Sequence, residues 1–162
     1  RGEHGAFQTP AKFPAKALVA VTTHALPTLC GFQAGRLMEV KDQAGLYPHP
    51  DDLQRDRLER IQDRGRLWKA LLSQGLVSDS DVPDRFSLTE IQAVYQYLGR
   101  TPSCLLMIQL EDILAESETP NLPGAPDSAY PSWRIKLSKP LDVWLRSPEV
   151  LQFARAVRRA RR

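Results

Sequence analysis

The stretch Ala17-Leu-Val-Ala-Val-Thr-Thr-His24 decides the fold, because a short apolar run ends there directly in polar residues. A continuous apolar run with β-branched residues is typical of a strand that is buried on both faces. We therefore predict a fully buried strand over about 17–22. Thr22, Thr23 and His24 then stand where this strand ends, which is where α/β enzymes carry their chemistry.

A second apolar run, Ser103-Cys-Leu-Leu-Met-Ile-Gln-Leu110, predicts another buried strand over about 103–110. Two such strands joined through helices form a βαβ unit with a parallel sheet, so the fold class is α/β. Glu111 and Asp112 follow the second strand. Adjacent side chains of an extended chain point to opposite faces, so this pair more often caps a helix or forms salt bridges than acts as acid and nucleophile.

Two helices are predicted between the strands. Spacings of three and four residues predict the first over about 51–74, with an apolar stripe that covers the sheet: Leu58, Ile61, Gly65, Trp68 and Leu72. The charged face lies opposite and comprises Arg55, Asp56, Arg60, Asp63 and Arg64. Ser87-Leu-Thr-Glu90 is a capping-box pattern, which begins a helix over about 87–99. We expect Trp68 to pack on the sheet rather than to bind a ligand.

The chain after the second strand is rich in proline. A loop over about 116–132 holds four of the 13 prolines, and their fixed φ angles predict a shaped loop. Ser147-Pro-Glu149 then begins a last helix over about 148–161, with Ser as N-cap and Pro at the first helical position. Its buried side is predicted to be Val150, Leu151, Ala154 and Val157.

The composition is that of a soluble globular protein, with 42% hydrophobic and 25% charged residues among 162. No run approaches the roughly eighteen apolar residues of a membrane span, and no secretory leader is recognisable. We therefore expect a cytoplasmic location and no membrane partner. The net charge of +3 is concentrated in Arg155, Arg158, Arg159, Arg161 and Arg162. Cations favour a helix C-terminus, and without interleaved aromatic residues we expect no nucleic-acid partner.

The cysteines and histidines predict neither a disulfide nor a metal site. The two cysteines are far apart in sequence, which favours two reduced thiols. Metal ligands recur at recognisable spacings, and no such spacing exists among the five residues of these types, His4, Cys30, His24, His49 and Cys104. No metal is therefore expected.

Three motifs resemble the amylomaltases, bacterial 4-α-glucanotransferases that move α-1,4-glucan chains between sugars. Val21-Thr-Thr-His-Ala-Leu-Pro-Thr-Leu-Cys-Gly31 resembles the family signature Val-Thr-Thr-His-Asp-Leu-Pro-Thr-Leu-x-Gly. Gln109-Leu-Glu-Asp-Ile-Leu-Ala-Glu-Ser-Glu-Thr-Pro-Asn-Leu-Pro-Gly124 is similar to Gln-Leu-Glu-Asp-Leu-Leu-Gly-Glu-x-Glu-x-x-Asn-Leu-Pro-Gly. Pro131-Ser-Trp-Arg-Ile-Lys-Leu137 is similar to Pro-Asn-Trp-Arg-Arg-Lys-Leu. Their order and spacing make chance an unlikely origin.

The resemblance implies the C-terminal part of a (β/α)₈ barrel, with strands seven and eight at about 17–22 and 103–110. It further implies a retaining reaction that uses one carboxylate as nucleophile and a second as acid/base. In the family both lie on earlier strands, outside this sequence, and the resemblance implies that no metal and no organic cofactor are needed. By position, His24 is expected to bind sugar, with Asn121 as a second candidate.

Ala25 stands where the family carries a third catalytic-site carboxylate, an Asp that holds sugar hydroxyls next to the cleaved bond. Such hydrogen bonds supply several kcal/mol in the transition state, and alanine has no polar side-chain atom. Three explanations stay open: an alanine introduced to trap substrate, a natural alanine in a homologue that binds glucan without turnover, or a local misalignment. The matching residues on both sides of Ala25 disfavour the last.

Two functions from different classes follow. The first is the C-terminal portion of a 4-α-glucanotransferase acting on maltodextrins, inactive by itself. The second is a non-catalytic glucan-binding or regulatory remnant. Two barrel strands alone leave parallel edges and apolar faces open, so we also expect association with the remainder of a barrel or with a second copy.

Overall fold

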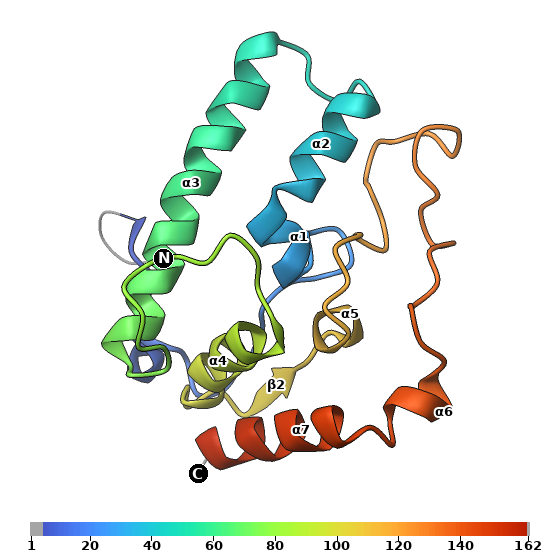
Figure 1. The fold of residues 1–162 in the computed structure, drawn as a ribbon. Coiled ribbons are helices and arrows are strands. Elements are labelled where there is room, and N and C mark those ends of the chain that lie inside the picture. Colours follow the sequence, from blue (N-terminus) through green and yellow to red (C-terminus); the bar gives the residue numbers. More distant parts are fainter. Residues whose placement is uncertain (1–4, 162) are drawn as a thin grey trace.

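The computed structural model describes residues 5–161, and His4 and Arg162, which were considered above, lie outside this range. Figure 1 shows the arrangement of the elements along the chain. The strands are β1 (Leu18–Ala20) and β2 (Leu105–Met107), and a short 3-10 helix lies at Pro10–Lys12. The α-helices are α1 (Leu29–Ala34), α2 (Arg36–Gln43), α3 (Pro50–Ser73), α4 (Leu88–Gly99), α5 (Leu110–Ile113), α6 (Leu141–Trp144) and α7 (Pro148–Ala160).

The two predicted strands pair in parallel, as expected for a βαβ unit, but both are shorter than predicted. Leu18 pairs with Leu105 and Ala20 with Met107, so each strand has only three residues. Their burial on both faces was a wrong prediction for this chain. Val19 is buried, whereas Leu18 is 53% and Leu105 is 59% exposed. Because side chains alternate along a strand, one face of the sheet joins the core and the other lies open.

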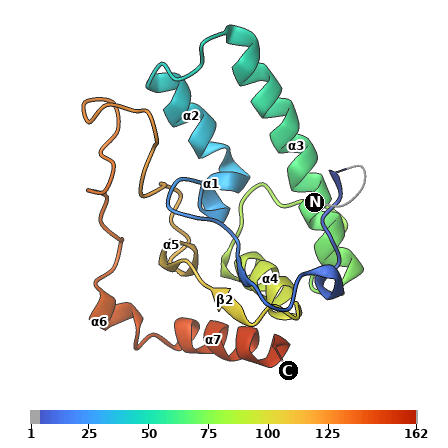
Figure 2. The same cartoon turned by 180° about the vertical axis from the view of Figure 1, so that it is seen from behind.

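The main core lies where α4 and α7 pack together beside the sheet, and both views show α7 running along α4 and β2 (Figures 1 and 2). Tyr95 of α4 meets Phe153 of α7 edge-to-face, with ring centroids 5.4 Å apart. The capping box of α4 forms as predicted, and the Glu90 carboxylate accepts a hydrogen bond of 2.7 Å from the Ser87 N–H. This helix is more enclosed than a single apolar face requires, since Ala93 and Tyr97 are also buried.

Helix α3 confirms the predicted span but reverses the predicted faces over its first half. Leu58 and Ile61, which were expected to be buried, are 54% and 64% exposed. Arg60, which was expected on the exposed face, lies against α1: its guanidinium sits 4.1 Å from the centre of the Phe32 ring and donates to the Phe32 carbonyl. The Arg60 side chain turns inward here because Phe32 of α1 offers it both a carbonyl and an aromatic face as partners.

The second half of α3 does enter the core. Trp68 is buried against Phe86, with ring centroids 6.1 Å apart, and its indole N–H donates to the Asp79 carbonyl at 3.0 Å. Trp68 shares the main core with Val19 of β1, so its expected structural role is confirmed. No sugar-stacking face is left on this ring.

The last helix begins as predicted, with the Ser147 hydroxyl accepting from the Val150 N–H. Its buried face was assigned incorrectly in part: Phe153 and Val157 are buried, whereas Leu151 and Ala154 are exposed. Arg161 follows the helix and donates to the carbonyls of Ser103 and Cys104, at 2.8 and 3.2 Å. This arginine therefore holds the end of α7 against the residues that precede β2.

The Pro-rich loop is longer than predicted and extends from the end of α5 to α6 (Figure 1). It is shaped by a small core of its own, in which Leu122 and Tyr130 of the loop pack against Leu37 and Val40 of α2. The loop is therefore fixed against α2. Within residues 5–161, no helix is long and apolar enough to cross a membrane.

Candidate functional site

The polar residues after β1 form a tight turn. The Leu26 N–H donates to the Thr23 carbonyl at 3.0 Å, which places His24 and Ala25 at the two central positions of a β-turn. His24 is exposed at this turn and Ala25 is half-buried. Thr22 is buried, and its hydroxyl donates to the Thr23 carbonyl. The turn thus presents His24 to solvent, four residues beyond the end of β1.

A single buried hydroxyl joins this turn to the Asn121 segment. Thr119 is 3% exposed, and its Oγ1 lies 2.9 Å from the Leu26 carbonyl, 3.2 Å from that of Asn121 and 3.4 Å from that of His24. A hydroxyl has one proton to donate, and the shortest of these contacts is the one to Leu26. The structure therefore brings the two predicted binding residues, His24 and Asn121, to the same place.

The segment around Trp133 contacts the same residues. The Trp133 N–H donates to the Pro120 carbonyl at 2.8 Å, and the Leu122 N–H donates to the Ser132 hydroxyl at 3.1 Å. The indole of Trp133 lies against the imidazole of His24, with ring centroids 5.1 Å apart and planes tilted by 42°. The three motifs that carry the resemblance thus converge on one cluster of loops.

Trp133 has an unusual backbone for its residue type. Its φ of +64° lies in the left-handed region, which costs an L-residue about 1–2 kcal/mol. The ring is nevertheless 65% exposed, so little burial offsets this cost. Backbone strain of this kind persists where the surrounding structure enforces it, and it concentrates at functional sites.

Asp112 anchors the start of α1, three residues beyond the end of the turn. Its carboxylate accepts hydrogen bonds of 2.7 Å from the Leu29 N–H and from the Tyr95 hydroxyl. Burial raises the pKa of Asp112 above its ordinary value, although both hydrogen bonds act in the opposite direction. The sequence predicted Glu111 and Asp112 at the end of a strand, whereas both lie in the short helix α5. Asp112 does cap a helix, as the sequence also suggested, because it accepts from the first N–H of α1.

Thr28 and Gly31 hold the start of α1 against the backbone of residues 116–117. The Thr28 hydroxyl accepts from the Gly31 N–H at 3.0 Å and donates to the Glu116 carbonyl at 2.6 Å. A Cβ on Gly31 would lie only 2.4 Å from the Ser117 carbonyl oxygen. Glycine is therefore required here by the close approach of the Ser117 backbone.

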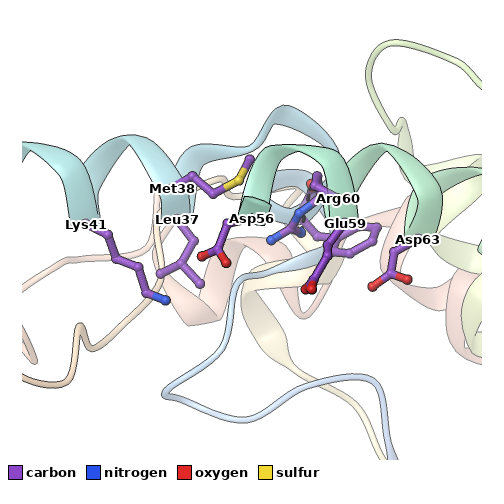
Figure 3. Close-up of a pocket in the computed structure, with 8 residues that line it drawn as sticks. Leu37, Met38, Lys41, Asp56, Glu59, Arg60 and Asp63 are labelled. Carbon is purple, nitrogen blue, oxygen red and sulfur yellow. Dashed lines mark hydrogen bonds between the residues drawn. The ribbon is translucent and has the colours of Figure 1, made fainter. Parts of the chain in front are cut away.

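Among the pockets formed by residues 5–161, two lie outside the Thr23–Leu26 turn. The first, ≈ 180 Å³, lies between α2 and α3 and is lined largely by charged side chains, among them Lys41, Asp56 and Arg60 (Figure 3). The second, ≈ 200 Å³, borders the cluster at Pro120 and is otherwise lined by Glu111, Glu116 and Glu118 together with residues 135–138. Neither pocket includes His24, Ala25 or Asn121 among its lining residues.

The Thr23–Leu26 turn and Trp133 carry no carboxyl group. Glycoside transfer with retention needs two carboxyl groups about 5 Å apart across the scissile bond. The turn supplies an imidazole at His24 and a methyl group at Ala25, beside the indole of Trp133. Among residues 5–161, no group of three or more His, Cys, Asp or Glu side chains could hold a metal ion.

The sequence missed two residues of this cluster. Trp133 lies inside a quoted motif, but neither its exposure nor its positive φ can be inferred from sequence. Thr119 gave no signal, because its role depends on the carbonyls of His24 and Leu26 in a turn that is more than ninety positions away in sequence.

Comparison with known proteins gives a consistent family assignment. A family model described as 4-alpha-glucanotransferase matches residues 1–142. The 4-alpha-glucanotransferases of Mycobacterium tuberculosis and Mycobacterium bovis are 39% identical over 124 residues, which cover 76% of this chain and 16% of theirs. That of Haemophilus influenzae is 27% identical over 142 residues, covering 85% of this chain and 20% of its own.

The crystal structure of amylomaltase from Corynebacterium glutamicum has the same fold over this region. It matches with a TM-score of 0.83 at 22% identity, covering 95% of this chain and 23% of that one. The chain therefore spans about a fifth of the length of the relatives it matches. On the family match and this shared fold, the chain belongs to the 4-alpha-glucanotransferase family.

Proposed function

We propose that this chain is the strand-seven and strand-eight portion of a 4-α-glucanotransferase barrel and contributes part of the binding site for α-1,4-glucan. The observation that carries the proposal is the convergence of the three family motifs at the C-terminal end of β1, with His24 exposed at the turn. In a parallel sheet, substrates bind at this end of the strands. We place its action in the cytoplasm, on maltodextrins.

The proposed reaction is transfer of glucan segments with retention, through a covalent glucosyl-enzyme. The nucleophile and the acid/base belong to earlier strands of the family barrel. The third carboxylate would stand at position 25, at the centre of the Thr23–Leu26 turn, where this chain has Ala25. A loss of several kcal/mol of transition-state stabilisation is expected, and each ~1.4 kcal/mol is a factor of ten in rate.

Incubation of the 162-residue chain with maltotriose tests this assignment. We expect no glucose and no longer maltodextrins, because this chain lacks the carboxylates of the reaction. Clear disproportionation would contradict the proposed inactivity.

The proposed glucan site is tested by calorimetry with maltoheptaose. We expect binding by the wild-type chain, weaker binding by His24→Ala and tighter binding by Ala25→Asp, which restores a hydrogen-bonding carboxylate at the turn. Arg158→Ala on α7, whose side chain is exposed, serves as a control that should bind like the wild type. Absence of any binding by the wild type would refute the glucan site.

The second candidate is a glucan-binding or regulatory remnant without turnover, which Ala25 favours. The intact mass of the natural protein separates the two. A mass of 18.2 kDa, that of this chain, would support the remnant. A mass several times larger would support the portion of a complete enzyme.

The open sheet face supports a further partner. Leu18, Leu105 and Met107 are all about half exposed or more, and Leu141, Val143 and Leu145 at α6 are 51–55% exposed. Groups of exposed large apolar side chains are typical of an interaction surface. We propose that the remainder of a barrel covers it, or a second copy in the isolated chain, which sedimentation velocity would detect as a dimer or larger species. A monodisperse monomer would rule out association with a second copy.

A further inference from the structure

Trp133 differs from the other two tryptophans of the chain. Trp68 and Trp144 are 4% and 2% exposed, whereas Trp133 is 65% exposed. Indole rings bury large apolar areas when they are covered, so an exposed one in a folded chain is a candidate contact for a partner or ligand.

The backbone of Trp133 is held by neighbours on both sides. The Trp133 N–H donates to the Pro120 carbonyl, and the Arg134 N–H donates to the Pro131 carbonyl at 3.0 Å. The segment is tied down further by Tyr130, which is buried and whose hydroxyl donates to the Thr119 carbonyl at 2.7 Å. A strained residue is therefore presented at a fixed position rather than left to move.

The neighbour of the ring indicates the ligand class. His24 lies within 5.1 Å of the Trp133 ring centre, and both side chains are exposed. An apolar aromatic face beside a group that can donate or accept a hydrogen bond matches a pyranose, which has an apolar C–H face and hydroxyls around its rim. Ligand sites combine apolar and aromatic walls with a few polar groups in this way.

We propose that Trp133 is a sugar-stacking residue, and that its indole and the His24 imidazole together form one glucose subsite for an α-1,4-glucan. The inference rests on the proposed function and goes beyond it, because it assigns a specific contact to a residue outside the β1 turn. The strained backbone and the contact with His24 aim the ring at the position that the sugar occupies.

The three tryptophans provide a direct readout with maltoheptaose as the probe. Acrylamide should quench the fluorescence of the wild-type chain mainly through Trp133, since the other two indoles are buried. Saturating maltoheptaose should reduce this quenching. Calorimetry on Trp133→Gly should show about tenfold weaker binding, because the stacking surface is lost, while Trp133→Phe should bind within a few-fold of the wild type.

The choice of glycine keeps the test independent of folding. A φ of +64° suits glycine without strain, so Trp133→Gly should melt at or above the wild-type temperature. Leu151→Ala, an exposed position on α7, is the control and should leave binding unchanged.

The outcomes separate this subsite from the proposed function. Binding by Trp133→Gly equal to that of the wild type would overturn the stacking role while the glucan site of the chain stands. Quenching of Trp133 that does not respond to bound maltoheptaose would overturn it in the same way. Absence of binding by the wild type itself would overturn both proposals.

Discussion

The carboxylate of Asp112 accepts a hydrogen bond of 2.7 Å from the backbone N–H of Leu29, across 83 positions of sequence. Leu29 is the first residue of α1, and the other carboxylate oxygen accepts from the Tyr95 hydroxyl at 2.7 Å. The Tyr95 hydroxyl in turn accepts from the Gln109 N–H at 3.1 Å. Asp112 therefore links the start of α1 to α4, and through Tyr95 to the residues that follow β2.

Replacement of Asp112 by alanine should be strongly destabilising. Two buried donors, the Leu29 N–H and the Tyr95 hydroxyl, would lose their acceptor, and each unsatisfied buried group costs about 1–3 kcal/mol. We expect Asp112→Ala to lower the free energy of unfolding by about 3 kcal/mol in urea titrations. Asp127→Ala is the matched control, because the Asp127 side chain is 81% exposed in its pair with Arg134. Equal losses of unfolding free energy in the two variants would contradict this structural role of Asp112.

The pKa of Asp112 gives a pH dependence with a defined sign. Burial raises the pKa of this carboxyl above its ordinary value of 3.8 in the folded chain, so the folded state binds the proton more tightly than the unfolded state. Its contribution to stability is therefore fully present below 3.8 and is lost as pH rises through the raised pKa.

Asp112→Asn removes this titration while it keeps an oxygen for the Leu29 N–H. Subtracting the free energy of unfolding of the variant from that of the wild type at each pH cancels the contributions of the other carboxyl groups. The free energy of unfolding of the wild type should fall relative to the variant as pH rises from 3.8. A difference that is flat or that rises over this range would show that the sign is wrong.

Gly31 and Gly65 should respond to alanine in opposite directions. A Cβ on Gly31 would meet the Ser117 carbonyl oxygen at 2.4 Å, whereas one on Gly65 in the middle of α3 meets nothing within 4 Å. Backbone cannot yield as a flexible side chain does, and overpacking costs about 1–3 kcal/mol. Gly65→Ala should instead stabilise by about 0.5–1 kcal/mol through helix propensity.

Thermal melts followed by circular dichroism compare the two glycine variants directly. Gly31→Ala should melt below the wild type and Gly65→Ala above it. A stabilised Gly31→Ala would mean that the Ser117 segment can move away from α1.

The sequence predicted those elements whose signals are local. The capping box at Ser87 and the Ser147-Pro148 start of α7 are local hydrogen-bond patterns, and both helices begin where they were expected. Parallel pairing of β1 and β2 was likewise correct. Short helices such as α1 and α2 were missed, because a few turns between loops carry little periodicity.

The burial predictions failed where the sequence does not show which element packs against a given face of a helix or sheet. Leu58 and Ile61 have the right spacing for a core stripe, yet the first half of α3 faces α2 with its charged side. Leu18 and Leu105 belong to apolar strands, but nothing in residues 5–161 covers their outer face. For the candidate site, His24 and Asn121 followed from the motif, whereas the contact between His24 and Trp133 depends on a loop conformation that spacing does not encode.

The two thiols should differ sharply in reactivity. Burial raises the pKa of Cys30 to about 11, with nearby Asp112 adding to the effect, and its Sγ donates to the Phe86 carbonyl at 3.5 Å. At pH 8 roughly one Cys30 in a thousand is the reactive thiolate. Cys104 is free and exposed. A disulfide reagent should therefore titrate one thiol quickly and the second slowly in the folded chain, and both quickly in denaturant. Cys104→Ser should abolish the fast phase, whereas a fast phase that survives in this variant would place Cys30 in solvent contact and contradict its burial.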